Sequence, residues 1–252
     1  MEEDIFYENI QKALENLPDN FSILEEQIDM EVQWQYFEFS GKIRTPEFSE
    51  ECFREREQLF DPAVGNERKK EILSGIANID DVAAFRTIEK FLQSAGGELK
   101  SWATLAFQES RMLLQSSLLD EQQIFISTGL GGKGHKLRYF TVFINQQQQE
   151  MLTSTQRKLL KDELIFELEK CDGEFEVIDF MEGFSTAQVM LPLKADIKQV
   201  FRNIVDECNQ YGHFLKDDFM ITNVKVLTRG EIIQFLEENR KQDNHELEEE
   251  SD

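Results

Sequence analysis

A glycine-rich stretch near the middle of the chain has the residue types that bind phosphate groups. Residues 129–134 read Gly-Leu-Gly-Gly-Lys-Gly, which matches the spacing G-x-G-x-x-G. Consecutive glycine N–H groups can form a concave nest that binds anions, and neighbouring basic side chains add positive charge to it. The pattern therefore predicts a candidate anion or nucleotide site composed of Gly129, Gly131, Gly132, Lys133, Gly134, His135, Lys136 and Arg138.

The charge pattern around this stretch points in the same direction. From Gln122 to Gln149 the chain has no Asp or Glu, although 50 of its 252 residues are acidic. Such a gap indicates that negative charge is excluded here. A bound anion would exclude it, and so would burial of the flanking strands, in which case the stretch is a hairpin connector or a linker between domains.

Three known uses of this glycine spacing do not fit. In a dinucleotide site the glycines must open a helix, whereas the residues that follow here, Leu137 to Ile144, have the composition of a strand. Protein kinases place such a loop between two strands, but no His-Arg-Asp or Asp-Phe-Gly follows. A Walker motif would need Ser or Thr after the lysine, and Lys133 is followed by Gly134.

Other residues that could carry chemistry are sparse. The three histidines lie far apart in the sequence, and the three cysteines have no Cys-x-x-Cys spacing. Asp179 is a carboxylate inside an otherwise apolar stretch, where we expect it to face solvent on a half-exposed sheet. The sequence therefore predicts no catalytic residue, no metal ligand and no cofactor. An enzyme that uses carboxylates is the least favoured class of function.

The composition favours a folded, acidic chain. Apolar residues make up 40% of the sequence, which includes 21 phenylalanines, and the formal net charge is −23. Because phosphate binding needs clustered Lys and Arg, this charge argues against nucleic acid and anionic membranes as partners. It favours a protein partner, with a basic one among the candidates. Reduced cysteines, a start unlike a signal peptide and the lack of a long apolar run predict the cytoplasm.

The first 120 residues predict an all-helical domain. Apolar spacing indicates one helix over residues 5–17 and a second that Ser22 caps, and Trp34–Phe39 is compatible with helix or strand. Further helices are expected after Pro46 and from Asn66. The next two helices, from Asp80 and from Leu99, resemble a HEAT-like repeat over about residues 66–118, which implies an antiparallel helical layer. A plain antiparallel helix bundle is the alternative.

The remaining residues predict an α/β domain over 121–241 that contains the glycine-rich loop 127–136. Its elements follow the order strand, helix, strand, strand, helix, strand, because two apolar runs around Glu182-Gly183 indicate a hairpin between two amphipathic helices. This order resembles a ferredoxin-like α/β sandwich, with Ile124–Ile126 as an extra N-terminal strand. Residues 242–252 predict a disordered acidic tail.

Together these observations predict an α+β protein with a HEAT-like layer followed by a ferredoxin-like domain. The function they favour is that of a cytosolic, acidic protein-binding or adaptor module without catalytic chemistry. A regulator that senses a small anion or nucleotide through the glycine-rich loop is the alternative, and the carboxylate enzyme comes third. The sequence predicts neither a particular partner nor an oligomeric state.

Overall fold

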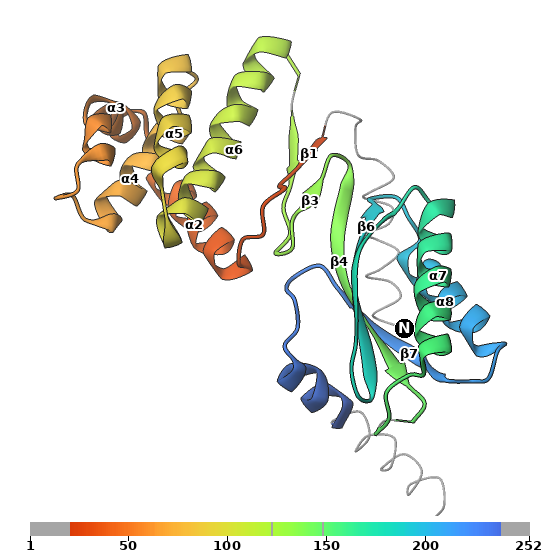
Figure 1. The fold of residues 1–252 in the computed structure, drawn as a ribbon. Coiled ribbons are helices and arrows are strands. Elements are labelled where there is room, and N and C mark those ends of the chain that lie inside the picture. Colours follow the sequence, from red (N-terminus) through yellow and green to blue (C-terminus); the bar gives the residue numbers. More distant parts are fainter. Residues whose placement is uncertain (1–20, 122, 148, 238–252) are drawn as a thin grey trace, which may run out of the picture.

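The computed structural model describes residues 21–121, 123–147 and 149–237. Helices make up its first half, and an antiparallel sheet with covering helices makes up its second half (Figure 1). The predicted α+β class is therefore confirmed. The helix expected over residues 5–17 and the tail 242–252 lie outside the described residues. The domain boundary near residue 120 stays a prediction.

The helical part begins and ends its helices largely where the capping residues indicate. Thr45 accepts a hydrogen bond from the N–H of Phe48 at one helix start, and Asp81 accepts from Ala83 and Ala84 at another. Trp102 lies in the core of this part and donates its Nε1–H to Ser74 Oγ at 3.0 Å. The elements are α2 (Met30–Ile43), α3 (Pro46–Arg54), the short 3-10 helix η1 (Arg56–Phe60), α4 (Asn66–Ala77), α5 (Val82–Ser94) and α6 (Gly97–Leu119).

The segment before α4 differs from the expectation in two places. Ser22 does not cap a helix, because it lies inside strand β1 (Phe21–Ile23), which pairs in parallel with β2 (Ile124–Ile126). Helix α2 starts later, where Asp29 accepts from the N–H of Glu31, and it continues through Trp34–Phe39 to Ile43. Pairing with a strand about 100 residues away outweighs the local helical spacing here.

The α/β part has the strand order of a ferredoxin-like sandwich. Its sheet runs β5-β6-β4-β7 with every neighbouring pair antiparallel, and short β3 extends the pairing at the start of β4. The expected extra strand Ile124–Ile126 exists as β2, but it pairs with β1 and not with this sheet. The elements are β3 (Gly132–Lys133), β4 (Lys136–Asn145), α7 (Ser154–Lys170), β5 (Glu174–Phe180), β6 (Phe184–Pro192), α8 (Ile197–Asn209) and β7 (Leu215–Thr222).

The last strand lies earlier in the sequence than its apolar run, Phe219–Leu227, indicates. The side chain of Asn209 bonds both the N–H and the C=O of Leu215, each at 3.0 Å. These two bonds begin β7 at Leu215, and the strand then lies antiparallel to β4 as far as Thr222. The polar side-chain contact, rather than the run of apolar residues, sets where the strand starts.

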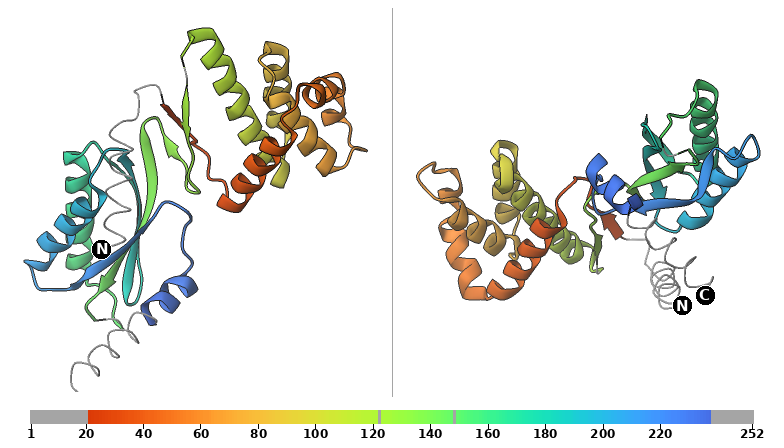
Figure 2. Two further views of the ribbon diagram at one scale, coloured as in Figure 1. Left: turned by 180° about the vertical axis from the view of Figure 1, so that it is seen from behind. Right: turned by 90° about the horizontal axis from the view of Figure 1, so that it is seen from below.

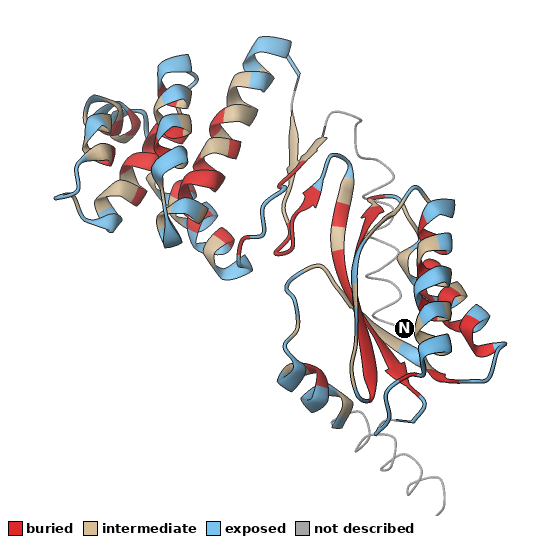
Figure 3. Cartoon of the chain, viewed as in Figure 1, coloured by how far each residue is buried: buried red, intermediate tan, exposed pale blue. Residues whose placement is uncertain are grey.

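The two faces of the sheet have different covers. Helices α7 and α8 lie together on one face, as Figures 1 and 2 show, and they bury the larger apolar core of this part. The opposite face buries Phe140 and Phe184 under Leu130 and under Ile232 of a C-terminal helical segment, residues 229–237. Figure 3 shows long buried stretches along β4 and β6. The central strands are therefore fixed from both sides.

Within the described residues, none of the helices combines the length and the apolar character that crossing a membrane would require.

We expect Phe201→Ala to lower the free energy of unfolding by roughly 3–5 kcal/mol, because the Phe201 ring is fully buried between α8 and the sheet. Urea denaturation measures the change. Tyr211→Ala is the control, because that side chain is 70% exposed, and its effect should stay within about 0.5 kcal/mol. Equal unfolding curves for the two variants would show that α8 does not form the core.

Candidate functional site

The glycine-rich stretch lies at the junction between the helical part and the α/β part. Gly129 to Gly132 are buried, while Lys133, Gly134 and His135 are exposed. The N–H of Leu130 donates to Asn223 O at 3.0 Å. The N–H of Gly131 donates to Thr128 O at 3.2 Å. These backbone donors are therefore engaged within the protein.

Three of these glycines stand where no side chain fits. A Cβ atom on Gly129 would overlap the carbonyl oxygen of Val224, and one on Gly132 would overlap that of Lys136. A Cβ on Gly131, whose φ is +67°, would meet the carbonyl oxygens of Glu25 and Glu26. Close approach of three backbone segments therefore accounts for the glycines at this junction.

The basic side chains of the predicted anion site pair with carboxylates. Lys133 and Lys136 contact Glu174 at 3.3 and 3.0 Å, and Arg138 contacts Glu176 at 2.7 Å. The hydrogen bond to Glu174 contributes most to raising the pKa of Lys136, and the bond from Lys136 lowers the pKa of Glu174. Strand β5 thus supplies in space the negative charge that residues 122–149 lack in sequence. Anion binding by this loop stays a prediction.

We expect Gly129→Ala to lower the free energy of unfolding by at least about 1–3 kcal/mol, because the new methyl group forces the chain away from Val224. Gly41→Ala is the matched control, since a Cβ at that exposed position inside α2 meets nothing within 4 Å. It should raise helix stability by roughly 0.5–1 kcal/mol. Thermal and urea unfolding of both variants measure the difference, and a neutral Gly129→Ala would contradict the packed junction.

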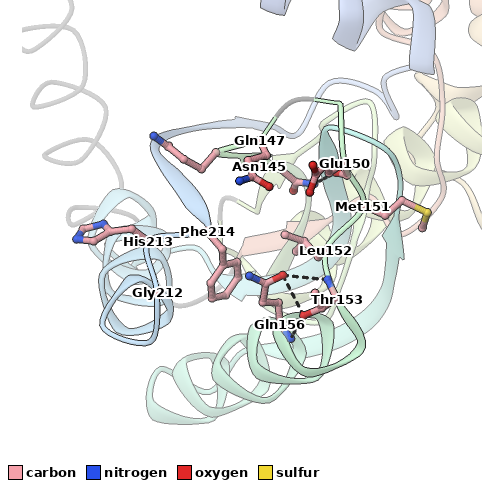
Figure 4. Close-up of a pocket in the computed structure, with 11 residues that line it drawn as sticks. Asn145, Gln147, Glu150, Met151, Leu152, Thr153, Gln156, Gly212, His213 and Phe214 are labelled. Carbon is pink, nitrogen blue, oxygen red and sulfur yellow. Dashed lines mark hydrogen bonds between the residues drawn. The ribbon is translucent and has the colours of Figure 1, made fainter.

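A pocket of about 170 Å³ opens at the far end of β4, which we call the end pocket (Figure 4). It lies between the loop that follows β4 and the turn that precedes β7. Polar side chains dominate its lining. The lining residues are Asn145, Gln146, Gln147, Glu150, Met151, Leu152, Thr153, Gln156, Gly212, His213 and Phe214.

Asn145 lines the end pocket and has a buried hydrogen-bond acceptor without a partner. The residue is only 1% exposed, and its Nδ2 donates to Glu150 O at 2.9 Å. Its Oδ1 is buried and has no hydrogen-bond partner among the described residues. A buried acceptor without a partner costs roughly 1–3 kcal/mol. A ligand with an N–H group would remove that cost.

Gln156 contributes a donor from the first turn of α7. Its Oε1 accepts from the N–H and the hydroxyl of Thr153, at 2.9 and 3.0 Å, within a capping box. These bonds fix the orientation of the amide (Figure 4). Its Nε2 makes no hydrogen bond to any residue that the structure describes. The helix start therefore presents one amide donor at the mouth of the pocket.

Phe214 forms the opposite wall. Its ring lies beside Gln156, whereas the ring of His213 points away from the other lining side chains (Figure 4). The positive φ angles of Gly212 and His213, +130° and +45°, shape the turn that brings Phe214 to this position. The N–H of Gln146 donates to Phe214 O at 2.9 Å and ties the two walls together.

Sequence reasoning did not identify this pocket. Asn145 ends a strand and Gln156 completes a capping box, and both are ordinary structural positions that carry no chemical motif. Only the packing shows that Asn145 Oδ1 is left without a partner. Of the residues discussed for chemistry, Asp179 is exposed on β5, as expected. No group of three or more His, Cys, Asp or Glu in the described part is arranged to hold a metal ion.

Comparison with known proteins gives structural similarity alone. No protein-family model and no curated protein sequence matches the chain. A protein from Deinococcus radiodurans described as a candidate transposase is similar at 16% identity and a TM-score of 0.37, over 42% of this chain and 93% of the other. A REP-associated tyrosine transposase bound to a REP hairpin is similar at 14% identity and a TM-score of 0.31, over 36% of this chain and 57% of the other.

These neighbours contradict three predictions made from the sequence. The predicted protein-binding or adaptor function, the predicted protein partner and the exclusion of nucleic acid are corrected, because the similar structures are transposases and one of them holds a nucleic-acid hairpin. At these TM-scores neither an activity nor a residue assignment carries over to this chain. The net charge of the whole chain does not exclude nucleic acid, because it says nothing about where the charges lie.

Proposed function

We propose that this chain binds single-stranded nucleic acid and holds one unpaired base in the end pocket. One observation carries this proposal: Asn145 lines the end pocket, and its buried Oδ1 has no hydrogen-bond partner among the described residues. Bound water could also satisfy such an acceptor. The donor and the aromatic wall around it favour a larger, planar ligand.

The groups in the end pocket match what a base presents. A base offers donors and acceptors along one edge and two aromatic faces, and proteins that bind single strands recognise both. Asn145 Oδ1 supplies an acceptor, Gln156 Nε2 supplies a donor, and Phe214 supplies a ring. Asn and Gln amides are also the side chains that pair with the edge of adenine in nucleic-acid complexes.

The size of the pocket limits the ligand to one small planar group. Drug-sized ligands occupy pockets of roughly 300–1,000 Å³, and the end pocket measures about 170 Å³. A base inside a duplex is stacked and paired, so it cannot enter such a pocket without leaving the stack. The proposal therefore requires an unpaired base, as in a single strand or a hairpin loop.

The charge of the chain is compatible with this partner because it is unevenly distributed. Residues 1–29 carry nine acidic residues and one lysine, and residues 238–252 carry seven acidic and two basic residues. These ends contribute −13 of the total of −23. Residues 124–237 hold 13 Lys and Arg against 17 Asp and Glu, a formal charge of −4. Local clusters of basic residues can therefore still attract phosphate.

We also propose a cytoplasmic location. The three cysteines support it, because Cys52, Cys171 and Cys208 are all free, and burial raises the pKa of the Cys208 thiol to about 12. Free, protonated thiols persist in a reducing compartment.

The test is the binding of fluorescently labelled single-stranded DNA and RNA oligonucleotides, followed by anisotropy. We expect Gln156→Glu to weaken binding about tenfold or more, since the amide donor is replaced by a charged acceptor. This change should leave the fold intact, because a Glu at this position completes the same capping box with Thr153. Asn145→Leu, which removes the acceptor, should weaken binding to a similar extent.

Gln199→Glu is the matched control. Gln199 occupies the equivalent position in the first turn of α8, where its N–H bonds the capping residue Asp196, and it is exposed away from the end pocket. The affinity of the Gln199→Glu variant for the oligonucleotides should equal that of the unsubstituted chain. If the unsubstituted chain shows no saturable binding of any single strand, the proposed function is wrong. If Gln156→Glu binds like Gln199→Glu, the base does not enter this pocket.

A further inference from the structure

The first two turns of α7 carry three basic side chains that lack an acidic partner. Arg157, Lys158 and Lys161 form no ion pair with any described residue. Asp162 lies one turn after Lys158, yet the two do not come within ion-pair distance. The Nε of Arg157 is buried and has no acceptor. These three cations are therefore free of direct ion pairs within the described protein, although Asp162 and Glu163 lie on the same helix.

Aromatic rings of β5 lie under two of these cations. The guanidinium carbon of Arg157 is 6.0 Å from the centre of the Phe180 ring, and Lys161 Nζ is 5.3 Å from that of Phe175. Both rings are partly buried against the core below α7. Proteins that hold single strands without regard to sequence combine a basic groove with aromatic rings on which bases stack, whereas here the rings lie beneath the cations and support them. Here the two kinds of residue follow one edge of the domain.

This edge begins at the end pocket. Gln156 lines the pocket, and Arg157 follows it in the first turn of α7, so the guanidinium of Arg157 belongs to the same helix start as the pocket wall. The free N–H groups and the dipole at the start of a helix also favour negative charge. The buried Oδ1 of Asn145 is a separate indication that a ligand occupies this end of the domain.

The basic residues of the glycine-rich loop provide a contrast within the same domain. Lys133 and Lys136 each contact Glu174, and Arg138 contacts Glu176. A phosphate at that loop would have to displace these carboxylates, whereas a phosphate beside Arg157 and Lys161 displaces none. The two groups of basic residues therefore differ in what they can bind, although they look alike in sequence.

We propose that the edge formed by α7 and β5 binds the sugar–phosphate backbone of the strand whose base enters the end pocket. This inference rests on the proposed function. Arg157, Lys158 and Lys161 contact phosphate oxygens, and the rings of Phe175 and Phe180 hold the cationic groups in place. The phosphate contacts add affinity that does not depend on sequence, while Asn145 and Gln156 select the base.

The test is the salt dependence of oligonucleotide binding in the full chain. For single strands, log affinity falls linearly with log salt, and the magnitude of this slope decreases by about 0.7 for each phosphate contact that is lost. We expect the triple variant Arg157→Gln, Lys158→Gln, Lys161→Gln to lose most of its affinity at low salt. The magnitude of its salt slope should be smaller by about 2, because three phosphate contacts are lost. Gln156→Glu should keep a slope closer to that of the unsubstituted chain, because all three of these cations remain.

Lys133→Gln with Lys136→Gln is the matched control, since it also removes basic side chains but ones that are paired with Glu174. It should leave the slope unchanged. If this control reduces the slope and the α7 variant does not, the glycine-rich loop binds the phosphates and the α7–β5 edge does not. If strands bind but neither variant changes the slope, this inference fails while the proposed function stands. Melting temperatures of all variants show whether a loss of binding reflects unfolding.

Discussion

Pairing of β4 with β6 is the interaction on which the rest of the structure depends. The two strands are in register from Lys136 opposite Pro192 to Ile144 opposite Phe184, in the middle of the sheet. The glycine-rich junction leads into one end of β4, and Asn145 lies at the other end. The same strand therefore joins the helical part to the sheet and places the buried amide of the end pocket. A shift of β4 by one residue in its register against β6 would turn the side chain of Asn145 to the opposite face of the sheet.

The distribution of charge decides how this acidic chain can bind an anionic ligand. Basic residues on β3 and β4 are neutralised by β5, while those on the start of α7 are not. The glycine-rich loop has the motif, and α7 has the uncompensated charge. A residue's partners in space, more than its neighbours in sequence, therefore determine whether its charge can attract a ligand.

The sequence predicts most of the elements but little of the candidate site. The helices expected after Pro46 and from Asp80 form at those positions, because a proline in the first turn and an Asp cap act within one turn and are visible locally. Strand β1 was missed because its partner, β2, is about 100 residues away. The end pocket could not be predicted, since the isolation of Asn145 Oδ1 depends on how the loop that follows β4 packs in the folded chain.

The most direct measurement is NMR spectroscopy of the side-chain amides during titration with a single-stranded oligonucleotide. We expect the side-chain amide resonances of Asn145 and Gln156 to shift saturably, because the base forms its hydrogen bonds with these two groups. In the same spectra, the backbone amide resonances of Gly129 to Gly132 should stay in place, because that segment is packed inside the junction. Shifts confined to the glycine-rich loop, with Asn145 and Gln156 unchanged, would contradict the binding of a base in the end pocket.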